Sequence, residues 1–546
     1  MAKTAQCGVS MKPRLPILCV VIFVSVIAVS KVRAQSQQAT STTPTIKVTS
    51  ALVFLDVTVL DKKGHTVTSG LTKDDFTVTE DKVPQIIFSF EAPEAHVMGV
   101  AAEDDNPTGN APKTILVMDL LNSSFEDFAY IRFEAAQFLK SQPPQLPSPT
   151  ELLVVGNESL EMLQNFTRSR AELLDALKRT PVALPYKHMN PISFVAERFG
   201  QSLDALDEIA LQNKGVLGRK NIVWVGHGSP NLYLGSNTLA PKLVEKLKQY
   251  VHSTTNMMVD ARISLFVIYP GLPVNGPPMT LSAMQAGVDL NEDDPFAGDI
   301  NFGLFANETG GKLFYNRNNV DAEINESEQI GSQYYTLTYQ PQPAEPDGEF
   351  RRVRVNLRNP NLRAVTKAGY YAPDEHAPID ERHQQMIKLA EAVRSAIPFK
   401  SLDLMLSGVV HHPDTRTVEF TVELKSKNLM FEPSDDGRSV AQLIAIAASL
   451  NQYGDILASR TQAVTLVAHS LDPAKLPDVA SRFPFAVRVP RKTRRVRLIL
   501  QAVDGGRLGS AEIDRNGIDA APAMDTPRPE LKHRPAADDS SPSSSN

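Results

Sequence analysis

Two short polar stretches follow apolar runs in the chain, and their residue types are suited to binding or to chemistry. The first follows the run Ile115 to Met118 and carries Asp119, Asn122 and Ser123. A continuous apolar run bounded by a turn indicates a strand that is buried on both faces of a parallel sheet. Polar residues just past the carboxyl end of such a strand face the ligand crevice. We expect Asp119 and Ser123 there; the alternative is that Asp119 only caps or braces the turn.

The second stretch is Gly226-His-Gly-Ser-Pro230, which follows the apolar run Ile222 to Val225. It resembles a nucleophile elbow, but the order is not Gly-x-Ser-x-Gly and Pro230 comes directly after Ser229. His227 is a loop histidine, for which a structural or solvated role is the alternative. The chain offers no complete catalytic constellation, so we expect no enzymatic activity.

Segments with helical periodicity separate these strands and predict the fold class. Phe125, Phe128, Ile131, Ala135 and Phe138 recur at helical spacing, and further strands are expected at 152–155, 263–269 and 312–315. Strands that alternate with helices of roughly 10–20 residues predict a doubly wound, mostly parallel α/β sheet. We expect this α/β domain to cover residues 112–340.

Length and charge narrow the classes of function. A chain of 546 residues predicts two to four domains, at roughly 100–200 residues each. The net charge of −6 is spread along the chain. It leaves no basic footprint for nucleic acid, and no small-molecule cofactor is expected.

The N-terminal residues predict the destination of the protein. Met11-Lys-Pro-Arg14 is positively charged, Leu15 to Ser30 is almost wholly apolar, and Val32-Arg33-Ala34 offers small residues for cleavage. This order is typical of a secretory signal peptide, expected over residues 1–34. The protein would then be secreted, or periplasmic in the cell envelope; the alternative is a retained anchor, which alone would bring membrane contact. Both cysteines, Cys7 and Cys19, lie in this segment, so the mature chain is expected to have no disulfide and no thiolate chemistry.

The remaining regions are expected to be β-rich or irregular. A flexible lead-in (35–45) precedes a small β module (46–92), which is too small to fold comfortably alone. A β hairpin extension (341–373) and a linker helix (374–400) follow the α/β domain. Short strands at regular spacing predict an immunoglobulin-like β-sandwich over residues 401–515. A disordered tail (516–546), rich in Ala, Pro, Asp and Ser, ends the chain.

Several separated motifs carry a resemblance to a known family. The strands that end at Asp119, at Gly228 and at Tyr269 fall in von Willebrand factor A order. Other motifs resemble secreted bacterial VWFA-related proteins of the acidobacterial type; they are Leu71-Thr-Lys-Asp-Asp-Phe76, Glu308-Thr-Gly-Gly311, Tyr334-Tyr-Thr-Leu-Thr-Tyr339 and Gly369-Tyr-Tyr371. The resemblance covers roughly residues 46–373. It implies a von Willebrand factor A-type (VWA-type) domain that binds a protein partner.

The resemblance also implies a metal site, which this chain keeps only in part. A metal-ion-dependent adhesion site holds Mg²⁺ through Asp-x-Ser-x-Ser, a Thr from a second loop and an Asp from a third, and an open position accepts a partner's carboxylate. Here Asp119 and Ser123 are kept, Leu121 replaces the middle Ser, and His227 stands where the third-loop Asp is expected. The loop that would supply the Thr is replaced by residues 185–191. Two oxygen ligands with one carboxylate make a poor, degenerate Mg²⁺ site.

The sequence therefore predicts a secreted, non-enzymatic, adhesion-type interaction protein. Its partner, a protein, would contact Asp119, Asn122, Ser123, His227 and Ser229. The first alternative is Mg²⁺-dependent adhesion, with Asp119 and Ser123 as metal ligands. The second alternative is a hydrolase. No cofactor is expected, except Mg²⁺ under the first alternative.

Overall fold

The computed structural model describes the chain from residue 52 to residue 524 with gaps. The described residues are 52–96, 110–157, 160–180, 191–232, 240–270, 294–296, 298, 300–315, 319–341, 347–372, 389–425, 429, 431–433, 438–468, 480–503 and 506–524. The expected signal peptide (1–34), the lead-in (35–45), the loop 185–190 and most of the linker helix lie outside them. Within the described ranges, no helix is both long and apolar enough to cross a membrane.

A six-stranded sheet forms the centre of the α/β domain, in the order β10-β9-β8-β5-β6-β7. Neighbouring strands are parallel, except that β7 runs antiparallel to β6. Because the strand order reverses at β5, the sheet is doubly wound, and the predicted α/β class is confirmed. The elements of this domain are β5 (Lys113–Asp119), α1 (Phe125–Ser141), β6 (Gln145–Val155), β7 (Leu160–Ser169), α2 (Arg170–Lys178), α3 (Pro191–Asn213), β8 (Lys220–Val225), α4 (Pro241–Asp260), β9 (Ile263–Ile268), α6 (Phe302–Glu308), β10 (Lys312–Phe314) and α7 (Val320–Ser332).

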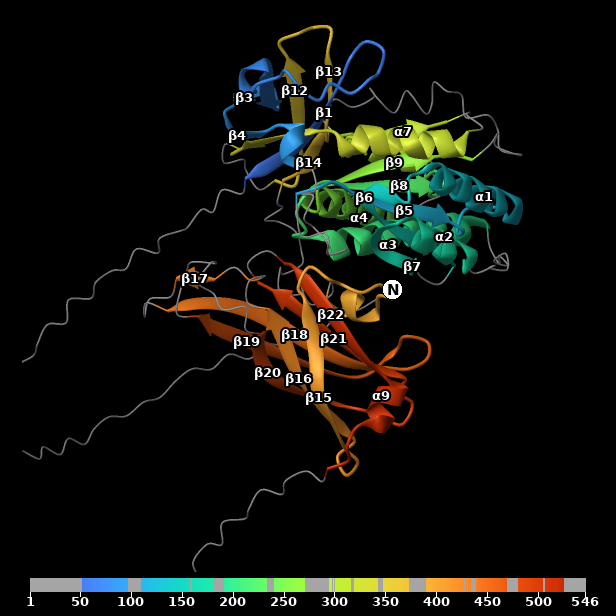
Figure 1. Ribbon diagram of the computed structural model, residues 1–546, viewed down its shortest axis with the longest axis vertical. Coiled ribbons are helices and arrows are strands. Elements are labelled where there is room, and N and C mark those ends of the chain that lie inside the picture. Colours follow the sequence, from blue (N-terminus) through green and yellow to red (C-terminus); the bar gives the residue numbers. More distant parts are fainter. Residues whose placement is uncertain are drawn as a thin grey trace, which may run out of the picture. The chain divides into compact units, whose positions relative to one another are not determined.

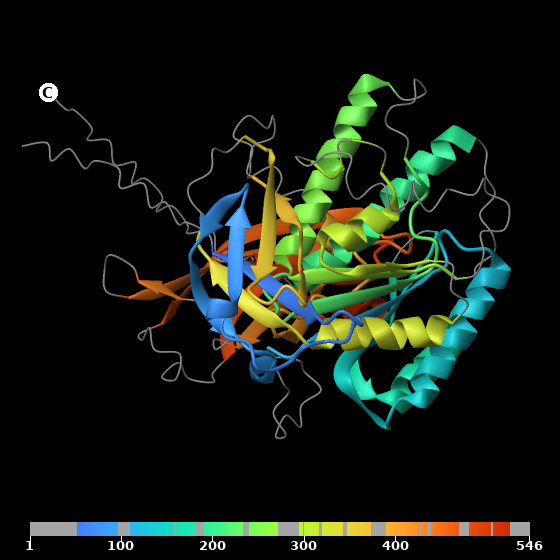
Figure 2. The same cartoon turned by 90° about the horizontal axis from the view of Figure 1, so that it is seen from above.

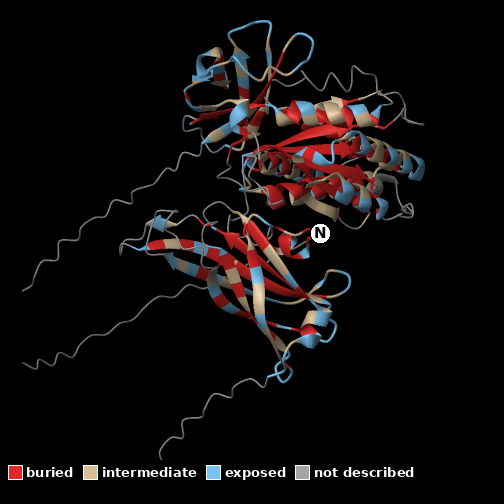
Figure 3. Cartoon of the chain, viewed as in Figure 1, coloured by how far each residue is buried: buried red, intermediate tan, exposed pale blue. Residues whose placement is uncertain are grey.

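Helices cover both faces of this sheet, because successive side chains of a strand point to opposite faces. Ile115 and Val117 of β5 pack with α3, α4 and α6. Leu116 and Met118, which alternate with them, pack with α1, α2 and α7. Figures 1 and 2 show the sheet between these helices, and Figure 3 shows its strands as buried. Every residue of β5 is buried, as the apolar run predicts.

The small β module is larger than residues 46–92, because strands from beyond the α/β domain complete it. Its first sheet has the order β13-β1-β11-β4 and its second has the order β14-β12-β2-β3. In the first sheet Val53 pairs with Tyr339, and in the second Val78 pairs with Val355. The segment 341–373 is therefore not a separate hairpin extension but part of this module, and so is the strand at Tyr335–Tyr339. About 45 residues bury too little apolar surface to be stable alone, and the returning chain supplies the missing core.

The strands of this module are short and are joined by two single-turn helices. They are β1 (Val53–Leu60), β2 (Phe76–Glu80), β3 (Val83–Gln85), β4 (Ile87–Glu91), β11 (Tyr335–Tyr339), β12 (Phe350–Leu357), β13 (Arg363–Val365) and β14 (Gly369–Tyr371), with 3-10 turns η1 (Lys73–Asp75) and η2 (Pro93–His96).

The C-terminal region is a β-sandwich of two antiparallel sheets around one apolar core. One sheet is β15-β16-β20; the other is β17-β18-β21-β22, with β19 paired to β18. Its immunoglobulin-like character stays a prediction. The strands are β15 (Leu404–His412), β16 (Thr417–Lys425), β17 (Glu432–Pro433), β18 (Ser439–Leu450), β19 (Ile456–Ala468), β20 (Ala480–Arg488), β21 (Arg495–Ala502) and β22 (Leu508–Asp514).

The first residues of the expected disordered tail are helical instead. Helix α9 (Arg515–Ala520) begins at Asp514, whose side chain accepts a hydrogen bond from the Gly517 N–H. Ile518 on this helix is fully buried in the sandwich core. One buried apolar side chain and a helix cap thus hold residues that their composition alone assigns to the tail.

Candidate functional site

Asp119 lies at the carboxyl edge of the parallel sheet, which we define as residues 119–123, 226–229, 269 and 315, where β5, β8, β9 and β10 end. Its side chain is fully buried. The Asn122 N–H donates to its Oδ1 at 2.9 Å, the Gly228 N–H donates to its Oδ2 at 2.8 Å, and the Trp224 indole N–H donates to Oδ2 at 3.2 Å. This single carboxylate therefore fixes the loop after β5 to the loop after β8.

Burial raises the pKa of Asp119 above its usual value. The hydrogen bonds from Asn122, Trp224 and Gly228, and the neighbouring His227, act in the opposite direction. A buried carboxylate is costly unless donors satisfy it. The three N–H groups supply that satisfaction, which favours the bracing role that the sequence left open for Asp119.

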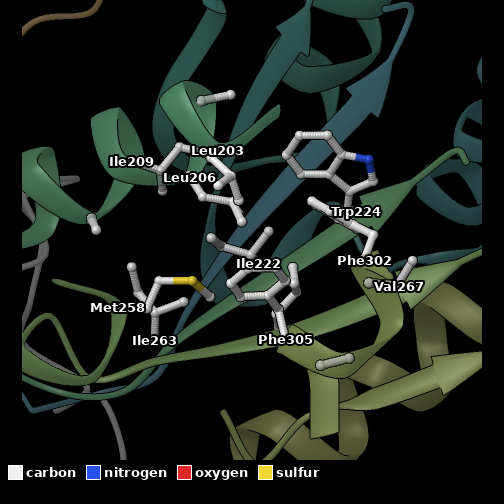
Figure 4. Packing of buried hydrophobic residues seen from close by; sticks show 14 of the residues in the cluster. Leu203, Leu206, Ile209, Ile222, Trp224, Met258, Ile263, Val267, Phe302 and Phe305 are labelled. Carbon is white, nitrogen blue, oxygen red and sulfur yellow. The ribbon is translucent and has the colours of Figure 1, made fainter. Parts of the chain in front are cut away.

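The two glycines beside His227 have a structural reason that the sequence did not reveal. A Cβ on Gly226 would lie 2.2 Å from the Asp119 Cβ, and a Cβ on Gly228 would lie 2.2 Å from the Phe302 ring. Gly228 also has a φ of +66°, a backbone conformation that L side chains rarely adopt. Figure 4 shows Trp224 and Phe302 side by side, with ring centroids 4.8 Å apart. The Gly-His-Gly order thus lets the loop lie tight against Asp119 and Phe302.

The loop after β5 is tied to helix α3 as well. The Asn122 side-chain amide donates to Ser202 Oγ at 3.1 Å, and the Arg198 guanidinium donates to the Leu121 carbonyl oxygen. Leu121, which stands where a metal site would have its middle serine, is 3% exposed and packs in the core. Ser124 then caps α1 by accepting from the Asp127 N–H, and Asp127 accepts from the Ser124 hydroxyl in return.

Two serine hydroxyls at this edge are buried and have no hydrogen-bond partner among the described residues. They are Ser123 Oγ and Ser229 Oγ. A buried hydroxyl without a partner costs free energy, so such groups are uncommon in folded proteins. Both belong to the residues that the sequence predicts for partner binding.

His227 is among the partly exposed residues of the predicted site. Its side chain is 32% exposed, and its Nε2 lies 3.5 Å from Asp127 Oδ2. Its ring meets Tyr269 edge to face, with centroids 5.9 Å apart, and Tyr269 meets Tyr315 in the same way at 5.8 Å. Sequence reasoning missed the two tyrosines, although each directly follows an apolar strand and their position was the available signal.

The structure thus brings the five predicted residues to one edge but gives them different surroundings. Asp119 is fully buried and Ser229 is 5% exposed, whereas Asn122 and His227 are partly exposed. Contact between these residues and a partner stays a prediction.

The arrangement does not fit Mg²⁺. Mg²⁺ needs several oxygen ligands at short, near-octahedral distances. Here N–H donors already occupy both oxygens of Asp119, Leu121 is packed in the core, and the third loop supplies His227. Thr167, which precedes the loop that would supply the Thr, lies buried in β7 and accepts from the Ser169 N–H.

A cavity lined by described residues lies at the other end of the sheet. It has a volume of about 300 Å³, and Pro93, His96, Pro112, Pro147 and Gln333 are among its lining residues. His96 in its wall is already engaged, with Nδ1 at 3.0 Å from the Tyr334 carbonyl oxygen and Nε2 at 3.1 Å from Glu91. It contains none of the predicted site residues.

Comparisons with known proteins add little to this geometry. No protein-family model matches the chain, and no curated protein matches it. Among solved structures, an aerotolerance-related membrane protein from Bacteroides fragilis is similar at a TM-score of 0.24 and 14% identity, covering 40% of this chain and 98% of that one. The SpRpn10 VWA domain is similar at a TM-score of 0.24 and 18% identity, covering 43% of this chain and 100% of that one. At such TM-scores these likenesses do not decide the fold, which the strand order of the sheet itself establishes.

Proposed function

We propose that the protein is a secreted, non-enzymatic interaction protein whose VWA-type domain binds a protein partner through the carboxyl edge, without Mg²⁺. The observation that supports this most strongly is the surroundings of Asp119. Three N–H donors from two loops bond to its carboxylate. A carboxylate so engaged holds the two loops in one shape and offers little to a cation. The same edge leaves Asn122 and His227 accessible to a partner.

Secretion and the finer fold assignments belong to the same proposal. The charged and apolar residues before Ala34 support export to the envelope or the medium. The strand order with one antiparallel edge strand supports the VWA type for the α/β domain. The two packed antiparallel sheets after residue 400 support an immunoglobulin-like sandwich.

Calorimetric titration with Mg²⁺ and then with Mn²⁺ separates this proposal from metal-dependent adhesion. We expect no saturable heat for the wild-type protein. A saturable signal that Asp119→Ala abolishes would revive the metal-dependent alternative, with Asp119 and Ser123 as ligands. The free energy of unfolding of the variant is measured beside it, so that loss of the fold is not mistaken for loss of a ligand.

Quantitative capture from the native envelope and medium tests the binding edge. The full chain is immobilised as wild type, as His227→Ala and as Met405→Ala, a control whose side chain is 63% exposed on the sandwich. We expect a protein retained by the wild type and by Met405→Ala, with or without EDTA, and retained less by His227→Ala. Equal capture by all three would remove the carboxyl edge from the proposal.

The hydrolase alternative has its own test. Within the described residues, Ser229 Oγ is not hydrogen-bonded to His227, although a reactive serine needs a base within hydrogen-bond reach. A panel of ester, peptide and phosphate substrates is expected to show no turnover. Turnover that Ser229→Ala abolishes would overturn the non-enzymatic proposal.

A further inference from the structure

A row of aromatic side chains crosses the carboxyl edge from one strand to the next. Tyr315 follows β10, Tyr269 follows β9 and His227 follows β8, and these three strands are neighbours in the sheet. The Tyr315 and Tyr269 rings stand at 83° to each other, and the Tyr269 and His227 rings at 64°. All three residues are partly exposed. We call His227, Tyr269 and Tyr315 the aromatic row.

A carboxylate stands at the His227 end of the row. Asp127, in the first turn of α1, lies 3.5 Å from His227 and is 34% exposed. Burial, together with the neighbouring Asp119 and Tyr315, raises the pKa of Tyr269. Among the described residues, His227 is the one basic side chain paired with Asp127. The edge therefore combines aromatic rings with one partly exposed carboxylate, that of Asp127.

We propose that the aromatic row and Asp127 receive a cationic side chain, lysine or arginine, from the protein partner. This rests on the proposed function and names the chemistry of the contact. Cations are attracted to the faces of aromatic rings within about 6 Å of the ring centroid. A carboxylate at the end of such a row adds a charge-assisted hydrogen bond, which a guanidinium makes best.

The polarity of this contact is the reverse of metal-dependent adhesion. In that mode a bound cation belongs to the domain and the partner brings a carboxylate. Here the partly exposed carboxylate of Asp127 belongs to the domain, so a partner carboxylate would approach a like charge. A partner cation instead meets complementary charge, which favours the correct partner and excludes acidic ones.

Capped tripeptides serve as probes because the partner itself is unidentified. Binding of acetyl-Gly-Arg-Gly-amide to the full-length protein is measured by saturation-transfer NMR. Two matched probes replace Arg by citrulline, which has nearly the same shape without charge, or by Asp. We expect the Arg peptide to bind about fivefold more tightly than the citrulline peptide, the ratio that one partly exposed cation–π contact provides. The Asp peptide should bind more weakly than either.

Variants of the row then locate the contact. Tyr269→Leu and Tyr315→Leu should each remove most of the preference for Arg over citrulline, because leucine has no aromatic face. Tyr269→Phe and Tyr315→Phe should restore it, because phenylalanine keeps that face. Asp127→Asn should lower the preference as well. If Tyr269→Leu fails to fold, the wild-type comparison of Arg with citrulline still decides.

The outcomes separate this inference from the proposed function. Equal binding of the Arg and citrulline peptides, or tighter binding of the Asp peptide, overturns the cation contact. Partner capture that His227→Ala lowers but both leucine variants leave unchanged overturns it too, while binding at the carboxyl edge stands. Capture that no edge variant affects overturns the proposed function itself.

Discussion

The two ends of the parallel sheet differ in the buried cations of one and the buried hydroxyls of the other. At the amino end, Lys113, Arg219 and Lys220 are almost completely buried, and each donates to oxygens supplied by the fold. Lys220 Nζ donates to the carbonyls of Val216 and Gly218 at 2.6 and 2.8 Å. At the carboxyl edge, two buried serine hydroxyls have no partner among the described residues. Glu151 Oε2 and Asn221 Oδ1 at the amino end also have no partner among the described residues. The contrast therefore lies in the buried cations, which make the amino end a structural joint, whereas the open groups of the carboxyl edge are hydroxyls that another molecule can satisfy.

Arg219 shows how the joint works. Its guanidinium donates to Thr58 Oγ1 in the β module, to Ser264 Oγ on β9 and to the Gly310 carbonyl, at 2.8, 3.0 and 3.1 Å. One side chain thus connects the β module to the α/β domain. Asp56 of the β module forms an ion pair with Arg262 of the α/β domain, which is a second connection between the two. The negative charge of Asp56 also lies near the Arg219 guanidinium. Such a network stabilises the fold most when every member has its hydrogen bonds, because a buried polar group without a partner costs free energy.

The largest expected effect is that of Arg219→Ala on stability. The change removes three hydrogen bonds and leaves a cavity among buried polar groups, so we expect a loss of about 3–5 kcal/mol in the free energy of unfolding. Urea denaturation at pH 7 measures it. Arg363→Ala, at an exposed position on β13, is the control and should change stability by less than about 0.5 kcal/mol. A loss below about 1 kcal/mol for Arg219→Ala would mean that the amino end is not a joint.

Glu151 is a second buried group at the amino end of the sheet, on β6. Its Oε1 accepts from the Gln212 side-chain amide at 2.9 Å, and burial raises its pKa to about 8. Between pH 4.5 and 8 the unfolded chain releases this proton while the folded chain keeps it. Its contribution to stability is therefore complete below the unfolded pKa and is lost as the pH rises towards 8, at about 1.4 kcal/mol per pH unit.

Glu151→Gln should remove this part of the pH dependence. Glutamine cannot ionise, it can still accept from Gln212, and its amide can donate to Gln212 Oε1, which lacks a partner within the described residues. We expect the variant to gain stability over the wild type from pH 5 to pH 8, measured by urea denaturation at four pH values. Glu308 and Glu328, whose burial raises their pKa to about 7, remain in both proteins, so the difference isolates Glu151. Parallel pH curves for the two proteins would contradict the buried neutral carboxyl; Glu161→Gln, at an exposed position, should follow the wild type.

The apolar runs of the sequence predicted the sheet, because strands buried on both faces must be continuously apolar. They also placed Asp119, Asn122 and Ser123 at the carboxyl edge. They did not predict what surrounds Asp119, because the donor Trp224 lies 105 residues away in the chain. The β module was predicted only in part for the same reason: the register that joins Val53 to Tyr339 has no local signal. The aromatic row was missed because the sequence shows each tyrosine after a strand but does not show that the three strands are neighbours.

The smallest expected effect compares two serines that are equally buried at opposite ends of the sheet. Ser229 and Ser264 are each 5% exposed. Ser264 Oγ accepts from Arg219, whereas Ser229 Oγ is without a partner in the described structure. Ser264→Ala should cost about 1–2 kcal/mol, because it leaves an arginine donor unsatisfied, and Ser229→Ala should be neutral or stabilising by up to about 1 kcal/mol.

The same pair of variants then distinguishes stability from binding. Partner capture should fall in Ser229→Ala, whose fold is intact, because the hydroxyl is expected to find its hydrogen bond only in the complex. Capture should not fall in Ser264→Ala at a temperature where that variant is folded. A buried hydroxyl without a hydrogen bond lowers the stability of the free protein. The Ser229 hydroxyl offsets that loss only if it forms a hydrogen bond in the complex. If Ser229→Ala is more stable than the wild type and still binds the partner fully, the Ser229 hydroxyl has no role in binding. The carboxyl edge must then recognise its partner through the aromatic row alone.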